Sequence, residues 1–161
     1  MYQQPNNRLK NQTCIVTGAN SGIGRAVAMS MARDGANVVV NYVFGDEVAQ
    51  QVVDEIAQMG GTAIAVKADV SKEDQVIAMF QETIATFGTV DILVNNAGLQ
   101  RDSAFHNMSL KDWQFVLDVN LTGQFLCSRE AIREFLRRGA RPDVSVALGK
   151  IICMSSVHEV I

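Results

Sequence analysis

Short apolar runs alternate with amphipathic segments along this chain. Five of the runs have the length and β-branched content of buried strands: Cys14 to Val16, Asn37 to Tyr42, Thr62 to Lys67, Asp91 to Val94 and Lys150 to Met154. The segments between them space their apolar residues helically and predict helices from Arg25 to near Asp34-Gly35, Asp46 to Met59, Lys72 to about Phe87, and Ser109 to roughly Arg138. This alternation predicts an α/β fold with a parallel sheet.

The carboxyl ends of the predicted strands are expected to lie together, because right-handed crossovers place the ends of parallel strands on one edge of the sheet. Open α/β sheets bind ligands at that edge. The loop after Val16, the pair Asn95-Asn96 and the pair Ser155-Ser156 should therefore meet. Ser71 precedes the third predicted helix and is expected to cap it.

The loop after the first strand is rich in glycine and leads directly into a helix. It reads Thr17-Gly18-Ala19-Asn20-Ser21-Gly22-Ile23-Gly24. Its glycines permit a tight turn, a backbone surface free of Cβ atoms, and close packing of helix against strand. Unpaired N–H groups at a helix start favour phosphate. The loop predicts a dinucleotide-binding cradle, with a purely structural glycine turn as the alternative.

Composition limits the class of protein. The 161 residues are 48% hydrophobic and 19% charged, which fits a single domain over residues 1–161. A net charge of −3 gives no electrostatic reason to expect nucleic acid or an anionic membrane as a partner. A local arginine cluster is interpreted as a solvated helix end because acidic residues share the region; it consists of Arg133, Arg137, Arg138 and Arg141.

The chain has the features expected of a cytoplasmic protein. Residues 1–11 are polar and lack the apolar core of a secretory signal, and no stretch is long and apolar enough to span a bilayer. Cys14, Cys127 and Cys153 lie in apolar runs without metal-ligand spacing. They are predicted to be small buried residues, and no metal site is expected.

A series of motifs, taken in order, resembles those of the short-chain dehydrogenase/reductases. They are the glycine loop Thr17 to Gly24, Asp69-Val70, Asn95 to Gly98, Asn120 within Asp118 to Gly123, and Ser155-Ser156 after a strand. Within that family, segments 128–132 and 154–160 resemble bacterial glucose 1-dehydrogenases, which oxidise the anomeric hydroxyl of an aldose with NAD or NADP. The resemblance runs from about Leu9 to Ile161 and implies a Rossmann-type doubly wound sheet, truncated after about five strands.

The resemblance implies cofactor contacts residue by residue. The pyrophosphate would be surrounded by Gly18, Asn20, Ser21, Gly22, Ile23 and Gly24. Asp69 and Val70 match an adenine-contacting pair, although Asp69 also suits a helix-entry turn. Asn95, Ala97 and Gly98 would line the ribose side, and Asn95 is equally consistent with a purely structural amide.

The choice between NAD and NADP is read at the end of the second strand, where an acidic residue would bind the ribose 2′-hydroxyl and repel a 2′-phosphate. Asn41 occupies that place, so the usual basis for strict NAD use is missing. Val43 stands where many NADP-using members have arginine, and Arg25 assists only if it turns toward the ribose. Dual use of NAD and NADP is predicted, with NADP slightly favoured.

Catalytic roles are also implied by the resemblance. Asn120 matches a residue that distorts its helix and holds a water in a proton relay, with an ordinary polar helix residue as the alternative. Ser156 matches the serine whose hydroxyl hydrogen-bonds the substrate oxygen, and Ser155 is its structural neighbour. His158 is a candidate contact to a sugar hydroxyl, with a solvent-facing loop residue as the alternative.

The family's acid–base pair, a Tyr-x-x-x-Lys motif after the serine, does not occur before Ile161. Neither Tyr2 nor Tyr42 has a lysine four residues later. Two functions stay open. One is the N-terminal portion of an oxidoreductase acting on a small-molecule alcohol or sugar; the other is a noncatalytic nucleotide-binding or subunit-association product. The isolated chain is expected to show no turnover.

Association with further copies is implied as well. In the family, the helix beginning near Ser109 contributes to homo-oligomers, dimers or tetramers. An unpaired apolar sheet edge is expected at Ile151 to Met154, together with an uncovered helix face. Aggregation or reliance on a partner is expected from such a surface.

Overall fold

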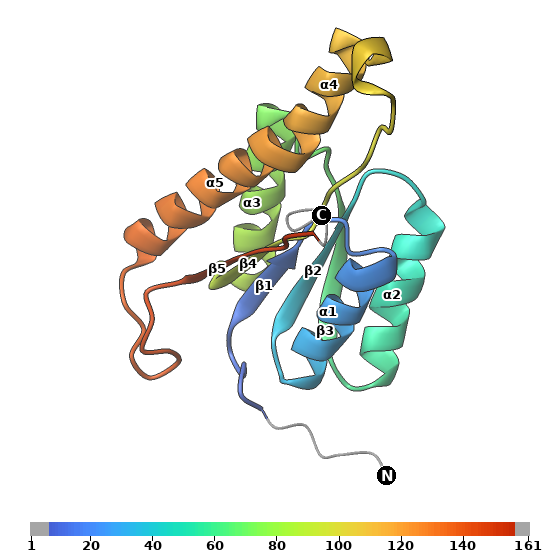
Figure 1. Ribbon diagram of the computed structural model, residues 1–161. Helices are drawn as coiled ribbons and strands as arrows, with labels where there is room; N and C mark the ends of the chain where they lie inside the picture. The colour runs from blue at the N-terminus through green and yellow to red at the C-terminus, as the bar shows by residue number, and fades with distance from the viewer. Residues whose placement is uncertain (1–6, 157–161) are drawn as a thin grey trace.

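A single parallel sheet organises the computed structural model, which describes residues 7–156. Its five strands lie in the order β3-β2-β1-β4-β5 (Figure 1). They are β1 (Thr13–Val16), β2 (Asn37–Tyr42), β3 (Thr62–Lys67), β4 (Ile92–Asn95) and β5 (Lys150–Cys153). Every pairing between neighbouring strands is parallel.

Helices connect the strands. They are α1 (Gly22–Arg33), α2 (Asp46–Gln58), α3 (Glu73–Phe87), α4 (Leu110–Leu117) and α5 (Gly123–Arg138). A 3-10 turn, η1 (Phe105–Asn107), precedes α4, and a π-helical turn, η2 (Asp118–Thr122), joins α4 to α5. In Figure 1, α4 projects beyond the edge of the sheet at which the strands end.

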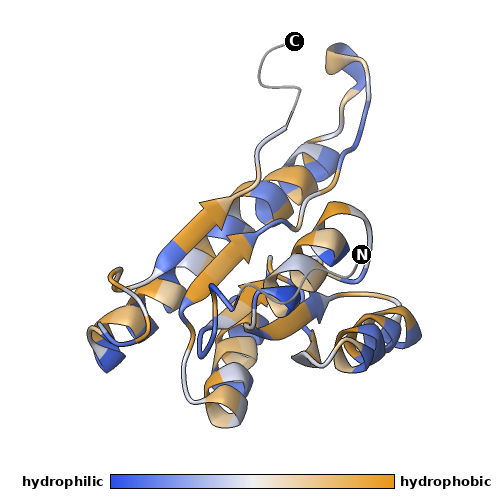
Figure 2. Cartoon of the chain, turned by 90° about the horizontal axis from the view of Figure 1, so that it is seen from below, coloured by the Kyte–Doolittle hydropathy of each residue, from blue (hydrophilic) through white to orange (hydrophobic). Residues whose placement is uncertain are grey.

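The two faces of the sheet carry separate cores. Alternate residues of each strand point to opposite faces, so Cys14 packs with α1 and α2 while Ile15 packs with α3 and α5. Figure 2 shows the apolar strands between these helical layers. The arrangement is the Rossmann-type doubly wound sheet predicted from the sequence.

Most element boundaries match the apolar pattern, with local exceptions. Helix α1 begins at Gly22, before the predicted start at Arg25, because the glycine loop itself turns into the first helical turn. The prediction that Ser71 caps the third helix is wrong: Lys72 is the N-cap of α3, and the Ser71 hydroxyl donates to Asp69 Oδ1 at 2.8 Å. Ser109 does cap α4, accepting from the Asp112 N–H at 3.1 Å.

A buried carboxylate lies at the amino-terminal end of β4. Asp91 is 3% exposed and accepts a hydrogen bond from the Thr13 N–H at 2.9 Å. Arg138 and Arg141 pair with it at 3.0 and 3.2 Å. The interpretation of a solvated helix end is therefore wrong for Arg138 and Arg141, because both pair with the buried Asp91, which is distant in sequence. Arg133 and Arg137 do fit that interpretation, since they are exposed and pair with glutamates on α5 itself.

The cysteines fall into two environments. Cys14 and Cys127 are buried, and burial raises the pKa of each thiol to about 12. Cys153 is exposed, so the prediction that all three are buried is wrong for this residue. It lies on β5, the edge strand, where Ile152 is also 41% exposed. The apolar edge expected at the last strand is therefore present.

We expect Asp91→Asn to destabilise the protein by about 3 kcal/mol, because it leaves the nearly buried Arg138 guanidinium without a countercharge. Urea denaturation measures the free energy of unfolding. Glu73→Gln is the matched control: it breaks an ion pair with Arg129 whose carboxylate is 59% exposed, and should cost less than about 1 kcal/mol. Equal costs for the two variants would contradict the role assigned to Asp91.

Thiol labelling should distinguish the cysteines. At pH 8 a maleimide is expected to modify Cys153 in the folded protein, because the two buried thiols stay protonated and shielded. Intact-mass spectrometry of the wild type and of Cys153→Ser measures the number of adducts. Rapid labelling of the serine variant under native conditions would show that Cys14 or Cys127 is accessible.

Candidate functional site

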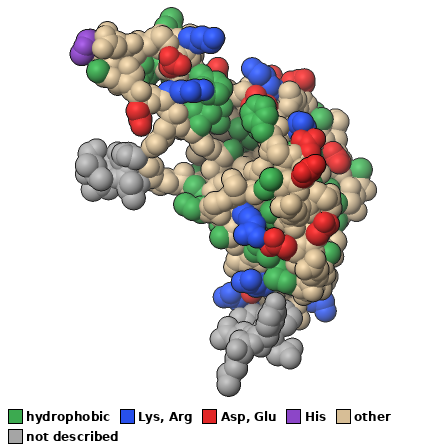
Figure 3. All heavy atoms as spheres, turned by 90° about the vertical axis from the view of Figure 1, so that its right-hand side faces the viewer, with side chains coloured by type: hydrophobic (Ala, Val, Ile, Leu, Met, Phe, Trp, Pro, Cys, Tyr) green, Lys and Arg blue, Asp and Glu red, His purple; other side chains and the backbone are tan. Residues whose placement is uncertain are grey.

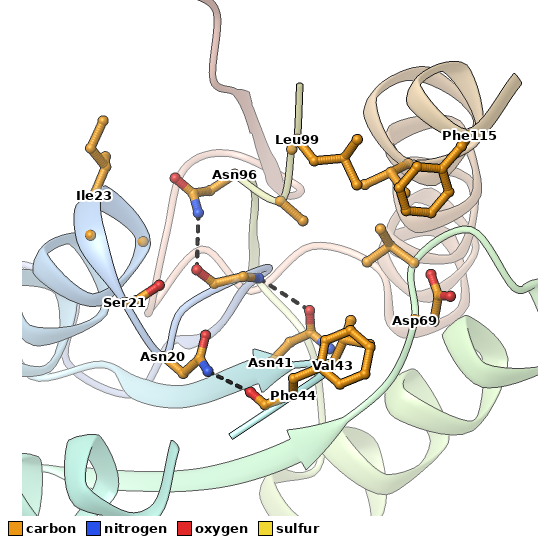
Figure 4. A pocket seen from close by; sticks show the side chains of 17 residues that line it. Asn20, Ser21, Ile23, Asn41, Val43, Phe44, Asp69, Asn96, Leu99 and Phe115 are labelled. Carbon is orange, nitrogen blue, oxygen red and sulfur yellow. Dashed lines mark hydrogen bonds between the residues drawn. The ribbon is translucent and has the colours of Figure 1, made fainter. Parts of the chain in front are cut away.

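A cavity of about 670 Å³ opens at the carboxyl ends of the strands. Figure 4 shows side chains from the glycine loop, the β2 end and α4 converging on it. Its walls are Gly18, Asn20, Ser21, Gly22, Ile23, Gly24, Asn41, Val43, Phe44, Asp69, Val70, Asn96, Ala97, Gly98, Leu99, Phe115 and Val119. The strand-end location and the volume are typical of ligand sites in open α/β sheets.

The glycine loop needs glycine for two different reasons. At Gly24, an added Cβ would overlap the Gly18 carbonyl oxygen and the Asn96 amide, so a side chain there would push the helix off the loop. At Gly22, φ is +52° and an added Cβ would have no heavy atom within 4 Å. The first position is fixed by packing, whereas the second leaves open space above the start of α1.

Thr17 ties the loop to the end of β4. Its hydroxyl oxygen accepts from the Asn96 and Ala97 N–H groups, both at 2.9 Å, and its own proton is donated to the Val94 carbonyl at 3.3 Å. Asn96 completes the tie, because its Nδ2 donates to the carbonyls of Thr17 and Gly18 at 2.9 and 3.2 Å. The glycine loop and the Asn95-Asn96 segment therefore meet, as predicted.

Asn41 supports the loop from the other side. Its Oδ1 accepts from the Gly18 N–H at 3.2 Å, and its Nδ2 donates to the Ala68 carbonyl at 2.9 Å and to the Val66 carbonyl at 3.3 Å. The residue is 1% exposed. These internal bonds use both amide donors of Asn41, and the residues that follow, Val43 and Phe44, line the cavity.

Asp69 forms the helix-entry turn that was considered for it, and it also lines the cavity. Its Oδ1 accepts from the Ser71 N–H at 2.9 Å and from the Ser71 hydroxyl, which forms the helix-entry turn. The residue also lines the cavity, next to Val70. It is the one acidic or basic side chain among the cavity walls drawn from residues 7–156. Contact with adenine remains a prediction for this pair.

Two asparagines predicted for the site, Asn95 at the end of β4 and Asn120 in η2, hold backbone and helix in place. Asn95 is 2% exposed, donates to the Ser128 hydroxyl at 3.0 Å and does not line the cavity, which favours its structural interpretation. Asn120 lies in η2, where its Oδ1 accepts from the Leu99 N–H and its Nδ2 donates to the Leu99 carbonyl, both at 2.9 Å. The predicted distortion of the helix at Asn120 is present; the water relay remains a prediction.

The predicted catalytic serine lies at the end of the described chain. Ser156 is exposed, and its N–H donates to the Ser155 hydroxyl at 2.6 Å. It follows β5, which pairs with β4, and does not line the cavity formed by residues 7–156. His158 lies outside the described residues. Tyr42, the tyrosine within the described range, is buried in β2 and 8% exposed.

Sequence analysis did not assign the apolar walls to the site. The unassigned walls are Phe44, Leu99, Phe115 and Val119, whereas Val43 had been considered beside the ribose; Asn96 was expected at the same edge without a role. The signal available for Asn96 was its position directly after a buried strand. Phe115 lies on α4 and Val119 in η2, and helical spacing by itself does not show which side chains of a helix line a cavity.

Metal-binding groups and membrane-spanning helices are two further features relevant to function. Within residues 7–156, no group of three or more His, Cys, Asp and Glu side chains is placed to hold a metal ion. The helices described here include none with the length and apolar content needed to cross a membrane.

Comparison with known proteins gives consistent matches. The family model for short chain dehydrogenase matches residues 12–160. The chain is 46% identical over 153 residues to 3beta-hydroxysteroid dehydrogenase 1 of Eggerthella lenta and 43% identical over 149 residues to 3-oxoacyl-[acyl-carrier-protein] reductase of Synechocystis. It is 40% identical over 152 residues to glucose 1-dehydrogenase 2 of Bacillus subtilis. These alignments cover 92% to 95% of this chain.

Solved structures agree with the fold. A short chain dehydrogenase from Mycobacterium avium superposes with a TM-score of 0.82 at 39% identity, over 92% of this chain and 53% of that chain. A short-chain dehydrogenase/reductase mutant from Serratia marcescens gives a TM-score of 0.83 at 29% identity, over 93% and 57% of the two chains. The chain spans 56% or 57% of the length of the curated relatives described above.

The Thr17 tie generates a stability prediction. Thr17→Val should destabilise the protein by about 3 kcal/mol, because it leaves the N–H groups of Asn96 and Ala97 without their acceptor. Thr17→Ser keeps the hydroxyl and should cost about 1 kcal/mol, through loss of one buried methyl group. Thermal and urea denaturation of both variants measure the difference. A serine variant as unstable as the valine variant would show that the methyl group carries the effect.

Proposed function

The chain belongs to the short-chain dehydrogenase family, and from this premise we propose that residues 7–156 form the dinucleotide-binding part of an oxidoreductase. The reaction proposed for the whole protein is hydride transfer between an alcohol or sugar hydroxyl carbon and NAD or NADP. The observation that carries the proposal is the open space above Gly22, at the start of α1 and inside the strand-end cavity.

The residues present fit a dinucleotide. A phosphate needs close approach to backbone N–H groups, which the missing side chain at Gly22 permits. Ser21 is the N-cap of α1 but makes no capping hydrogen bond with its side chain, so this side chain does not occupy the first N–H groups of the helix, where a phosphate would bind. The proposed pyrophosphate contacts are Gly18, Asn20, Ser21, Gly22, Ile23 and Gly24, with Asp69 and Val70 at the adenine and Ala97 and Gly98 along the ribose. When bound, the nicotinamide would accept or supply the hydride.

A glucose-like aldose oxidised at C1 is the substrate we propose. The relatives described above are named as a steroid dehydrogenase, an oxoacyl reductase and a glucose dehydrogenase, at 40% to 46% identity. All of these names describe exchange between a hydroxyl and a carbonyl group. The resemblance of segments 128–132 and 154–160 to glucose dehydrogenases favours the sugar.

The catalytic assignments are proposals of the same kind. Ser156 would donate a hydrogen bond to the substrate oxygen as its charge changes. Asn120 would act through the distortion at η2, which exposes backbone groups to a relay water. The general base would be a tyrosine beside a lysine, and within residues 7–156 the buried Tyr42 is not placed for that role.

A specific surface favours the alternative function, subunit association. Apolar side chains at helical spacing along η2 and α5 are exposed: Leu121 (65%), Phe125 (59%), Ile132 (48%) and Leu136 (69%). Their spacing of four, seven and four residues puts them on one stripe. We propose that this stripe contacts a second copy of the chain in a homo-oligomer. A cytoplasmic location is proposed with it, on the sequence features alone.

Gly22→Ala tests dinucleotide binding. The new Cβ would project into the space proposed for the pyrophosphate, so affinity for NADH and NADPH should fall at least about tenfold. Gly60→Ala is the matched control: φ there is +80° and its Cβ also meets no heavy atom within 4 Å, but the residue lies outside the cavity.

Both variants should lose about 1 kcal/mol of stability from the positive φ angle, so folding alone cannot separate them. Fluorescence titration with each dinucleotide measures the affinities, and urea denaturation measures the stabilities. Unchanged affinity in the Gly22 variant, or an equal loss in the Gly60 variant, would contradict the proposed site.

A further inference from the structure

We propose that this chain selects NAD over NADP, and that the β2–α2 turn makes the selection because its cavity wall is apolar and, among the described residues, no lysine or arginine lines the cavity. The inference rests on the proposed dinucleotide function and deepens it. It also departs from the slight preference for NADP expected from the sequence, because the structure shows how the nearby cations are engaged.

The turn after β2 is where selection takes place. In doubly wound folds, the strand end about 20 residues beyond the first glycine receives the adenosine ribose, where an acid binds a 2′-hydroxyl and a cation binds a 2′-phosphate. Here the Asn41 amide is used internally, and Val43 and Phe44 line the cavity. Asn20 Nδ2 donates to the Phe44 carbonyl at 2.8 Å, which holds the turn against the glycine loop.

The two cationic side chains on the neighbouring elements, Arg25 on α1 and Lys67 on β3, each form an ion pair. Arg25, on α1, has its guanidinium on the Glu55 carboxylate of α2. Lys67 is the sheet partner of Tyr42 at the end of β3, and its Nζ lies 3.0 Å from Asp46 in the first turn of α2. The hydrogen bond to Asp46 raises the pKa of Lys67.

The other charged side chains named near the β2–α2 turn are carboxylates, and Arg101 lies on the α4 side of the cavity. Asp46 and Glu47 occupy the first turn of α2, and Asp69 lines the cavity. No lysine or arginine is among the cavity walls drawn from the described residues. Arg101 stacks on the Phe115 ring, 5.4 Å from its centroid, on the α4 side. Figure 3 shows the α1–α2 side of the molecule, where carboxylates gather with cations interspersed.

A 2′-phosphate at this turn would be left without compensation. It carries between about −1.5 and −2 charges and loses water on binding, while Val43 and Phe44 offer no hydrogen bond from their side chains. A neutral 2′-hydroxyl has a much smaller desolvation cost and can bond to backbone groups of the turn. The difference favours the dinucleotide without the phosphate.

The first experiment compares NADH and NADPH on the wild-type protein and on Val43→Arg by fluorescence titration at fixed ionic strength. Wild-type protein should bind NADH at least about tenfold more tightly than NADPH. The arginine should tighten NADPH binding about tenfold, through a charge-assisted contact, and should shift the ratio of the two affinities toward NADPH.

A second pair of variants tests the engagement of Lys67 without touching the cavity wall. Asp46 is 65% exposed, so Asp46→Asn should fold normally and release the Lys67 ammonium group. It should tighten NADPH binding several-fold more than Glu47→Gln does. The control makes the same charge change in the same helical turn but leaves the Lys67–Asp46 pair intact.

The outcomes separate this inference from the proposed function. Equal affinities, or tighter binding of NADPH by the wild type, would overturn the selection while leaving dinucleotide binding in place. Equal effects of the Asp46 and Glu47 variants would overturn the role of the ion pair. Binding of neither dinucleotide by folded protein would overturn the proposed function itself, and this inference with it.

Discussion

The candidate site depends on the hydrogen bonds that join the carboxyl ends of β1 and β4 at Thr17. The Thr17 hydroxyl has one donor and two acceptor positions, and all are used within the tie. Asn96, 79 residues away in sequence, then holds the Gly18 carbonyl while Asn41 holds the Gly18 N–H from the β2 side. The glycine loop is therefore positioned from both neighbouring strands, and the start of α1 follows from that position.

β4 is anchored at both of its ends. At its amino-terminal end, Asp91 joins β1 to α5 and the loop beyond it through Thr13, Arg138 and Arg141. At its carboxyl end, Asn95 joins α5 through Ser128. A strand held in this way sets the spacing between the glycine loop and η2, which lie on opposite sides of the cavity. The geometry of the cavity thus depends on hydrogen bonds and ion pairs, while most of the buried side chains belong to the two apolar cores.

The two edges of the sheet differ in exposure. β3 and β5 are both edge strands; β3 packs against α2, whereas β5 has exposed side chains at Ile152 and Cys153. The chain spans little more than half of its relatives' length. The cavity proposed for the cofactor lies at the carboxyl ends of the strands, and the stripe proposed for association runs along η2 and α5.

The sequence by itself determined the strands, the helices and the glycine loop, because each depends on local periodicity or on a residue with unusual backbone freedom. Asn37–Tyr42 and Thr62–Lys67 match their apolar runs, and Gly18, Gly22 and Gly24 lie in the cavity as expected. Asp69 forms the helix-entry turn and lines the cavity, while its contact with adenine stays a prediction.

Only the tertiary structure decided what each polar side chain bonds to. The local pattern around Arg138 and Arg141 resembles a solvated helix end, yet Asp91, 50 residues before Arg141, takes both guanidinium groups. Cys153 lies in an apolar run but on an edge strand, so it is exposed. Asn41 was expected near a ribose, yet its buried amide hydrogen-bonds the Gly18 N–H and the Ala68 carbonyl. Periodicity indicates which residues are buried, whereas the partner of a buried polar group is set by the packing of segments distant in sequence.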